Sequence, residues 1–265
     1  MSEEQESILR AHGIKAIFSD GSSHEGALLV GLDGAHSAVR ATLCPAHPKP
    51  DPLPVHLLGL ELTLTRAQIA PLIAMDPVVM LGDSPFGICG FFAVLASPEV
   101  TAPPEGAPGV PEGNDARIAL LRERLSHMWR EMRDAVEGSI TPETTINTLT
   151  IADWVVPDEG WDNLGGRVTL AGDAAHTMTM FRGEGFNNAV LDVANLVSTI
   201  SEIYSTPTVD EDKRAALITE YDAELCDRSP RVVIASRQQC FMIHDWEKYE
   251  AWTKASQWGA PHQKV

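Results

Sequence analysis

The chain has 265 residues, of which 44% are hydrophobic, enough for a substantial core in one large or two smaller domains. Its formal net charge of −17 would repel nucleic acid and anionic membranes, so neither is expected as a partner. The four cysteines are widely separated, no apolar run reaches the length of a membrane span, and the first residues, MSEEQESILRAHG, are acidic rather than signal-like. These features predict a cytoplasmic protein.

The N-terminal part of the chain predicts a short helix followed by two strands. Residues 2–12 are expected to be helical, with Ser2 as the N-cap. AIF at 16–18 and ALLVGLD at 27–33 are predicted as the strands of a hairpin, joined through the turn sequence SDGSS. The prolines between residues 44 and 54 then indicate an irregular connection and a domain boundary.

The central part predicts a mixed module of strands and one long helix. Strands are expected at 55–65, 87–97 and 145–156, and a Pro/Gly-rich loop at 98–113. Apolar residues recur at helical spacing over 115–136, and Gly138 follows as a stop. Phenylalanines in this module (Phe86, Phe91 and Phe92) are compatible with an apolar substrate cavity, although such residues are usually ordinary core.

The stretch LAGDAAHTMTMFRGEGFNNAV, residues 170–190, joins a strand to a helix through small residues. RVTLA at 167–171 predicts a short buried strand, and apolar residues at helical spacing follow Asn187. Because a helix N-terminus offers free backbone N–H groups, this loop suits an anionic or electron-rich group. Further helices are expected at 212–228 and 230–256, separated or kinked at Pro230.

Two segments resemble the fingerprints of FAD-dependent monooxygenases related to para-hydroxybenzoate hydroxylase, the class A flavoprotein monooxygenases. The first is DGAHSAVR, which matches the family's Asp-Gly motif through Asp33, Gly34, Ser37 and Arg40. The second is GDAAH, which matches its Gly-Asp motif and is followed by the FRGEG loop at 181–185. Their order and separation also fit the family, with the substrate module between them.

The resemblance implies roles for these residues around FAD. Asp173 would accept hydrogen bonds from the ribityl hydroxyls, and backbone N–H groups of 183–188 would face the flavin ring. Asp33 and Gly34 would lie toward the pyrophosphate, whereas Arg40 would either organise its loop or help meet the reducing cofactor, NAD(P)H. No catalytic residue and no metal ligand is implied; His176 is expected to organise the loop. The full cofactor-binding set is Asp33, Gly34, Arg40, Gly172, Asp173, Phe181, Arg182, Gly183, Gly185, Phe186, Asn187 and Asn188.

The resemblance also implies a fold. It is an α/β (α+β) fold in which an incomplete Rossmann-like FAD-binding domain (1–45 and 155–230) holds an inserted mixed-sheet substrate domain (46–154), followed by C-terminal helices (231–265). The family opens with a G-x-G-x-x-G turn that holds the FAD pyrophosphate, and this sequence contains none. An N-terminally truncated member, whose remaining sheet edge is open to a partner or to self-association, is therefore expected.

Three functions remain open at this point. The first is a monooxygenase of secondary metabolism that uses FAD, NAD(P)H and O2 to hydroxylate or epoxidise an aromatic or polyketide-like small molecule. The second is a truncated, inactive homologue. The third is a non-catalytic interaction protein that keeps the scaffold and covers its open edge with a partner.

Overall fold

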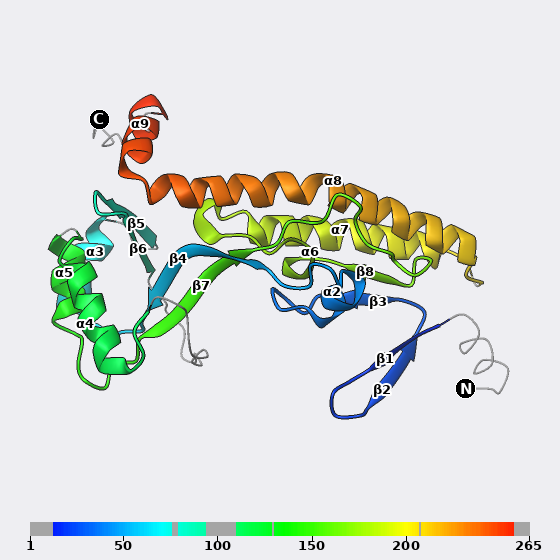
Figure 1. Cartoon of the computed structure of the whole chain (residues 1–265), viewed down its shortest axis with the longest axis horizontal. Coiled ribbons are helices and arrows are strands. Elements are labelled where there is room, and N and C mark those ends of the chain that lie inside the picture. The colour runs from blue at the N-terminus through cyan, green and yellow to red at the C-terminus, as the bar shows by residue number, and fades with distance from the viewer. Residues whose placement is uncertain (1–12, 76–78, 94–109, 129, 207, 257–265) are drawn as a thin grey trace. The chain divides into compact units, whose positions relative to one another are not determined.

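A computed structural model describes residues 13–75, 79–93, 110–128, 130–206 and 208–256 (Figure 1). The helix expected at 2–12 lies outside the described residues. The chain divides into two compact units: unit 1 comprises Met1–Pro52 and Ala152–Gln238, and unit 2 comprises Leu53–Ile151 and Gln239–Val265. Each unit mixes helices with small sheets, which confirms the expected α/β fold class.

Unit 1 contains two small sheets. Strands β1 (Ile14–Ile17) and β2 (Ser23–Gly26) form an antiparallel hairpin, whereas β3 (Leu29–Gly31) pairs in parallel with β8 (Val168–Leu170). The predicted hairpin partner, 27–33, is therefore wrong. The turn closes early, because Asp20 accepts hydrogen bonds from the backbone and hydroxyl of Ser22. The returning strand consequently starts at Ser23, and the following apolar residues join the core.

The helices of unit 1 carry most of its core. Helices α7 and α8 run antiparallel side by side, as Figure 1 shows and as the contacts of Asn188 with Arg228 and of Asn195 with Glu224 require. Their facing residues pack with Leu170 at the end of β8, and Tyr221 donates a hydrogen bond to the Leu170 carbonyl over 3.0 Å. The helical elements are α2 (Ala38–Leu43), α6 (Asp173–His176), the 3-10 helix η1 (Met180–Arg182), α7 (Gly185–Ile203) and α8 (Glu211–Ile243).

Helix α8 continues through Pro230, so the two separate helices expected around this residue are one. Pro230 has no N–H to donate to the preceding turn, which weakens the helix locally. Packing outweighs that loss, because Leu225 and Val233 are fully buried on the two sides of the proline. The sequence-based boundary at residue 230 is therefore not a structural break, and α8 ends at Ile243, with α9 (Trp246–Ser256) following it.

Unit 2 consists of two strand pairs and short helices around a separate apolar core. Helices α4 and α5 pack with the β5–β6 hairpin through Met128, Met132 and Met80. The register of that hairpin pairs Val79 with Ala93 and Ser84 with Ile88. The elements are β4 (Asp51–Gly59) paired with β7 (Asn147–Asp153), β5 (Val79–Ser84) paired with β6 (Ile88–Ala93), and helices α3 (Arg66–Met75), α4 (Asn114–Leu125) and α5 (Arg130–Glu137).

Three details of unit 2 differ from the sequence-based expectation. The proline-rich connection already contains the start of β4. Pro52 and Pro54 stand at alternate positions of this strand, so the residues between them keep their N–H groups for pairing with β7. The helix expected at 115–136 is broken into α4 and α5, with a turn in which the Ser126 hydroxyl donates to the Glu123 carbonyl over 2.6 Å. Helix α3 and strand β5 were not expected. No helix among the described residues is long and apolar enough to cross a membrane.

Candidate cofactor site

The turn after β8 exposes one carboxylate. Gly172 adopts φ 61° and ψ −146°, a conformation that favours glycine, and it sends the chain directly into α6. Ala174 and Ala175 are fully buried, so the turn stays close to the core. Asp173, in contrast, is exposed at the start of α6, where its carboxylate can accept hydrogen bonds from a ligand.

A buried carboxylate, Asp192, lies beneath this turn. It accepts hydrogen bonds from the Gly172 backbone over 2.8 Å, from His176 Nε2 over 2.6 Å and from Arg228 over 2.5 Å. Burial alone would raise the pKa of Asp192, but these donors hold it below its ordinary value. His176 therefore organises the turn from within, and the described residues contain no group of acids, histidines or cysteines that could hold a metal ion.

The loop before α7 brings backbone donors to the surface. Gly183 adopts the left-handed conformation at φ 65°, and no heavy atom lies within 4 Å of the position that a Cβ there would occupy. Glu184 stands at the N-cap of α7 without a side-chain cap, and its carboxylate pairs with Arg182 over 2.7 Å instead. The first N–H groups of the helix are therefore available to a ligand. Phe186 in the first turn is 79% exposed.

The Asp-Gly motif has a structural task in the described chain. Asp33 accepts hydrogen bonds from the Ser37 hydroxyl over 2.5 Å and from the Ala38 backbone over 2.7 Å, so it ties down the start of α2. Burial opposes these contacts, which nevertheless keep the pKa of Asp33 below its ordinary value. Gly34 has φ 76° with open space beside it, which leaves its backbone accessible.

Arg40 joins the two motifs. Its guanidinium is fully buried and donates to the carbonyls of Asp173 over 3.3 Å, Ala174 over 3.1 Å and Pro48 over 3.2 Å. It also lies 5.1 Å from the centre of the Trp154 ring. These are the contacts of a residue that organises its loop, the first of the two roles considered for it. Because the side chain is buried, it offers no surface to a dissolved dinucleotide.

Several of these contacts involve residues that sequence reasoning missed: Asp192, Arg228 and Trp154. The signal for Asp192 was an acidic residue inside the otherwise apolar helical run AVLDVANLV, which predicts a buried charge with partners. No comparable signal exists for Arg228, since it lies 36 residues further along the chain.

The chemistry of this donor and acceptor set fits a flavin cofactor. An exposed carboxylate at Asp173 can accept from hydroxyl groups, and the uncapped start of α7 offers N–H donors and a positive helix end. Helices α6 and α7 pack together, and a Cβ added at Gly172 would lie 3.6 Å from the Ala189 Cβ, so we treat both features as one candidate site. The individual cofactor contacts stay predictions.

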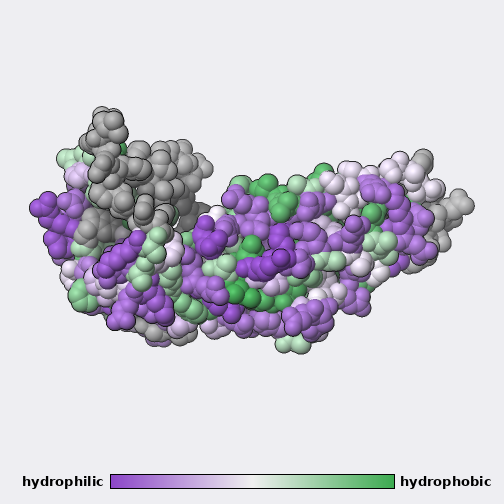
Figure 2. Space-filling view, turned by 90° about the horizontal axis from the view of Figure 1, so that it is seen from above, coloured by the Kyte–Doolittle hydropathy of each residue, from purple (hydrophilic) through white to green (hydrophobic). Residues whose placement is uncertain are grey.

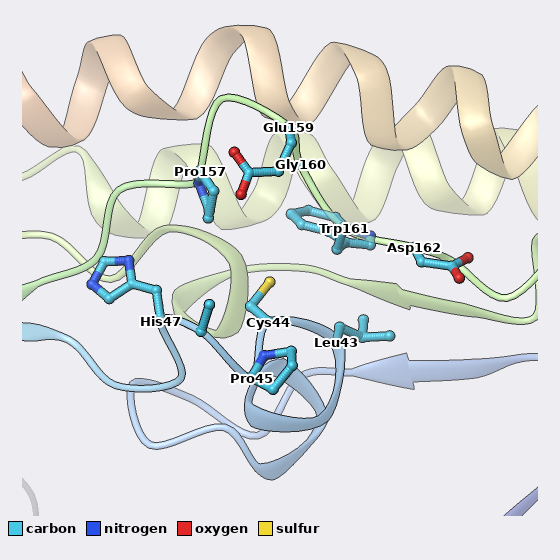
Figure 3. Close-up of a pocket in the computed structure, with 10 residues that line it drawn as sticks. Leu43, Cys44, Pro45, His47, Pro157, Glu159, Gly160, Trp161 and Asp162 are labelled. Carbon is cyan, nitrogen blue, oxygen red and sulfur yellow. The ribbon is translucent and has the colours of Figure 1, made fainter.

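A separate pocket of about 230 Å³ lies between the end of α2 and the loop 157–162 (Figure 3). Cys44 and Trp161 point into it, and His47, Glu159 and Asp162 are at its margin. It is smaller than ligand pockets of about 300–1,000 Å³, and none of the expected cofactor-binding residues lines it. We therefore place the candidate site at Asp173 and α7 rather than in this pocket.

Comparison with known proteins points to one family. A family described as "FAD binding domain" matches residues 114–236. The chain is 37% identical to the FAD-dependent monooxygenase dbaB of Emericella nidulans over 214 residues, which are 73% of this chain and 54% of that protein. It is 33% identical to a probable FAD-dependent monooxygenase of Arthroderma benhamiae over 267 residues, covering 90% of this chain and 62% of the relative.

Solved structures of FAD-bound proteins are similar to this chain in fold. Klebsiella pneumoniae HpxO in complex with FAD and uric acid superimposes with a TM-score of 0.69 at 25% identity, over 92% of this chain and 59% of the neighbour. A single-substitution variant of HpxO with FAD gives a TM-score of 0.69 at 26% identity over 92% of this chain and 60% of the neighbour. The chain spans 54% to 62% of the length of the two curated relatives described above. By sequence and by fold, the chain belongs to the FAD-dependent monooxygenases of the class A type.

Proposed function

We propose that this chain forms part of a monooxygenase that uses FAD, NAD(P)H and O2 to insert one oxygen atom into an aromatic or polyketide-like small molecule. The observation that carries the proposal is the pairing of an exposed carboxylate, Asp173 on α6, with the uncapped N-terminus of α7, the helix on which α6 packs. Family membership supports it, since one curated relative is described as an FAD-dependent monooxygenase and another as a probable one.

The residues of unit 1 would bind and orient the flavin. FAD supplies the oxygen-transfer chemistry when it is bound, so the task of the protein is to hold it and to exclude water. Asp173 would accept hydrogen bonds from cofactor hydroxyls, and the positive end of α7 would favour negative charge on the ring. Arg40 and Asp33 keep the two supporting turns in place from below, through the contacts with the Asp173 carbonyl and the start of α2.

Unit 2 would bind the substrate. Phe86 and Phe91 are 64% and 56% exposed, whereas Phe92 packs into the unit 2 core. On the β5–β6 hairpin, Phe91 pairs across the strands with Leu81, which is also exposed, so one face of this hairpin offers apolar surface. Such a surface suits an aromatic ring. A relative from Streptomyces platensis, described as a 3-amino-4-hydroxybenzoate 2-monooxygenase, supports an aromatic substrate.

Anaerobic reduction of the FAD-loaded protein tests this function. NADH or NADPH should bleach the visible absorption band of the bound flavin, and admission of O2 should restore it. With a panel of hydroxylated aromatic acids, a product that carries one atom from labelled O2 identifies the reaction. FAD-loaded protein that neither nicotinamide cofactor reduces would contradict the proposal.

A second candidate is a non-catalytic interaction protein, which one surface feature favours. Phe186, Val190, Val193 and Val197 follow helical spacing on one side of α7, and their exposed fractions are between 45% and 79%. Figure 2 shows hydrophobic patches between hydrophilic residues where α7 and α8 lie. Light scattering distinguishes the candidates: a stable assembly without FAD binding would favour the interaction protein over the enzyme.

A further inference from the structure

The two predicted flavin-binding segments are connected beneath the surface by a single carboxylate. Asp192 is fully buried in the middle of α7. Its Oδ2 accepts from the Gly172 N–H and from His176 Nε2, both in the turn that carries Asp173. Its Oδ1 accepts from Arg228 Nη2 on α8. All of these contacts lie within unit 1.

Arg228 continues the connection to the loop before α7. Its Nη1 donates to the Asn188 side chain over 2.8 Å, and the Asn188 amide donates to the Glu184 carbonyl over 2.9 Å. Arg228 also pairs with Glu224 over 2.7 Å, which fixes the guanidinium on α8. A chain of hydrogen bonds thus runs from the Gly172 turn through Asp192 and Arg228 to the predicted flavin loop.

The geometry of His176 shows that its ring serves this connection. The ring is fully buried, and its Nδ1 has no hydrogen-bond partner among the described residues. The Nε2–H form satisfies the short contact with Asp192, whereas a proton on Nδ1 would be buried without an acceptor. His176 and Asp192 together hold α6 on α7.

We propose that Asp192 is a positioning residue for the flavin, an inference that rests on the proposed function. It does not touch the cofactor in this account. Its carboxylate fixes the exposed Asp173 side chain and the N–H groups at the start of α7 in one arrangement, because it contacts both the Gly172 turn and Arg228. An asparagine at this position would keep the shape, but its amide NH2 would face either Arg228 or the Gly172 N–H and His176.

The test compares Asp192→Asn with Asp222→Asn. Asp222 is a second buried carboxylate of unit 1, and its hydrogen bonds go to Thr169 and Asn163 rather than to the flavin segments. In an FAD titration followed by flavin fluorescence, we expect Asp192→Asn to weaken binding about 10- to 100-fold, the range seen when supporting contacts of a site are lost. Asp222→Asn should bind FAD within about threefold of the wild type, a difference too small for a lost supporting contact.

A double variant separates positioning from stability. Asp192→Asn deprives Arg228 of its buried carboxylate partner and leaves only the exposed Glu224, and replacing Arg228 with Gln removes this less compensated cation. The double variant Asp192→Asn/Arg228→Gln should therefore recover part of the lost melting temperature but none of the FAD affinity. Recovery of both would overturn the positioning role. If Asp192→Asn does not fold, Arg228→Lys keeps the charge but cannot reach both Asp192 and Asn188, and weakened FAD binding is again expected.

The outcomes distinguish this inference from the proposed function. Wild-type protein that is folded but binds no FAD would contradict the proposed function and the inference together. Wild-type protein that binds FAD, with Asp192→Asn and Arg228→Lys binding equally well, would overturn the inference alone. Hydrogen exchange supplies a readout without cofactor: Asp192→Asn should speed exchange at 172–188, and Asp222→Asn should not.

Discussion

Unit 1 contains two buried aspartates on neighbouring helices, Asp192 on α7 and Asp222 on α8, whose hydrogen-bond donors differ. Asp192 accepts from Arg228 as well as from His176 and a backbone N–H, whereas Asp222 accepts from the Thr169 hydroxyl and the Asn163 amide. Burial opposes ionisation at both. The pKa of Asp192 nevertheless lies below its ordinary value, and that of Asp222 is raised by burial to about 6.

The comparison shows that burial alone does not decide the charge of a carboxylate. Hydrogen bonds from His176, from the Gly172 N–H and from Arg228 keep the pKa of Asp192 low, so its carboxylate can hold two segments through charge-assisted hydrogen bonds. At Asp222 the hydrogen bonds from Thr169 and Asn163 do not offset the effect of burial, so its pKa is raised to about 6. Asp192 therefore stays ionised and holds its partners at neutral pH, whereas the contribution of Asp222 to stability depends on pH.

Removal of the Asp192 carboxylate should have the largest effect on stability. Asp192→Ala removes the buried one of the two carboxylate partners of the half-buried Arg228 and leaves only Glu224, and it also removes the acceptor of the Gly172 N–H. We expect a loss of about 3–5 kcal/mol in the free energy of unfolding, measured in urea at pH 7. Asp222→Ala, which breaks only neutral donor contacts, should lose about 1–3 kcal/mol. Equal losses would remove the distinction between the two sites.

The pH dependence of stability should separate the two sites next. Because the folded state raises the pKa of Asp222 from 3.8 to about 6, the folded chain holds this proton where the unfolded chain has released it. The contribution of Asp222 to stability therefore falls by up to about 3 kcal/mol as the pH rises from about 4 to about 7.

Unfolding of the wild type and Asp222→Asn across this pH range measures that contribution. The difference between their free energies of unfolding should change in favour of Asp222→Asn as the pH rises. The lowered pKa of Asp192 has the opposite sign: its contribution is present above about pH 4 and is lost only as the pH falls further. Parallel curves for the wild type and Asp222→Asn would show that Asp222 does not titrate in this range.

The smallest effect is expected at Thr169, which is fully buried and donates to Asp222 over 2.5 Å. Thr169→Val keeps the shape of the side chain but removes this donor, so the pKa of Asp222 should rise further. We expect a loss of about 1 kcal/mol at pH 7 and a shift of the Asp222-dependent transition to higher pH. An unchanged transition would mean that the hydroxyl does not support the carboxylate.

Local patterns were sufficient to predict the strand β8, the turn at Gly172 and the start of α7, because each depends on residues close in sequence. The hairpin partner was missed because SHEG at 23–26 is short and exposed and has no apolar alternation. A separation or a kink was expected at Pro230, and the separation is wrong because burial of Leu225 and Val233 outweighs one missing hydrogen bond. Long-range contacts such as Asp192 with Arg228 depend on how α7 and α8 pack, which the sequence alone did not reveal.

The central claim is that unit 1 holds FAD through Asp173 and the start of α7, and an FAD titration of matched variants tests it most directly. Asp158 is an exposed acid of the same unit outside the site, so Asp158→Asn controls for the loss of one surface charge. We expect saturable binding with a shifted flavin spectrum for the wild type and Asp158→Asn, and roughly tenfold weaker binding for Asp173→Asn. Equal binding by all three proteins, or none by folded wild type, would contradict the account.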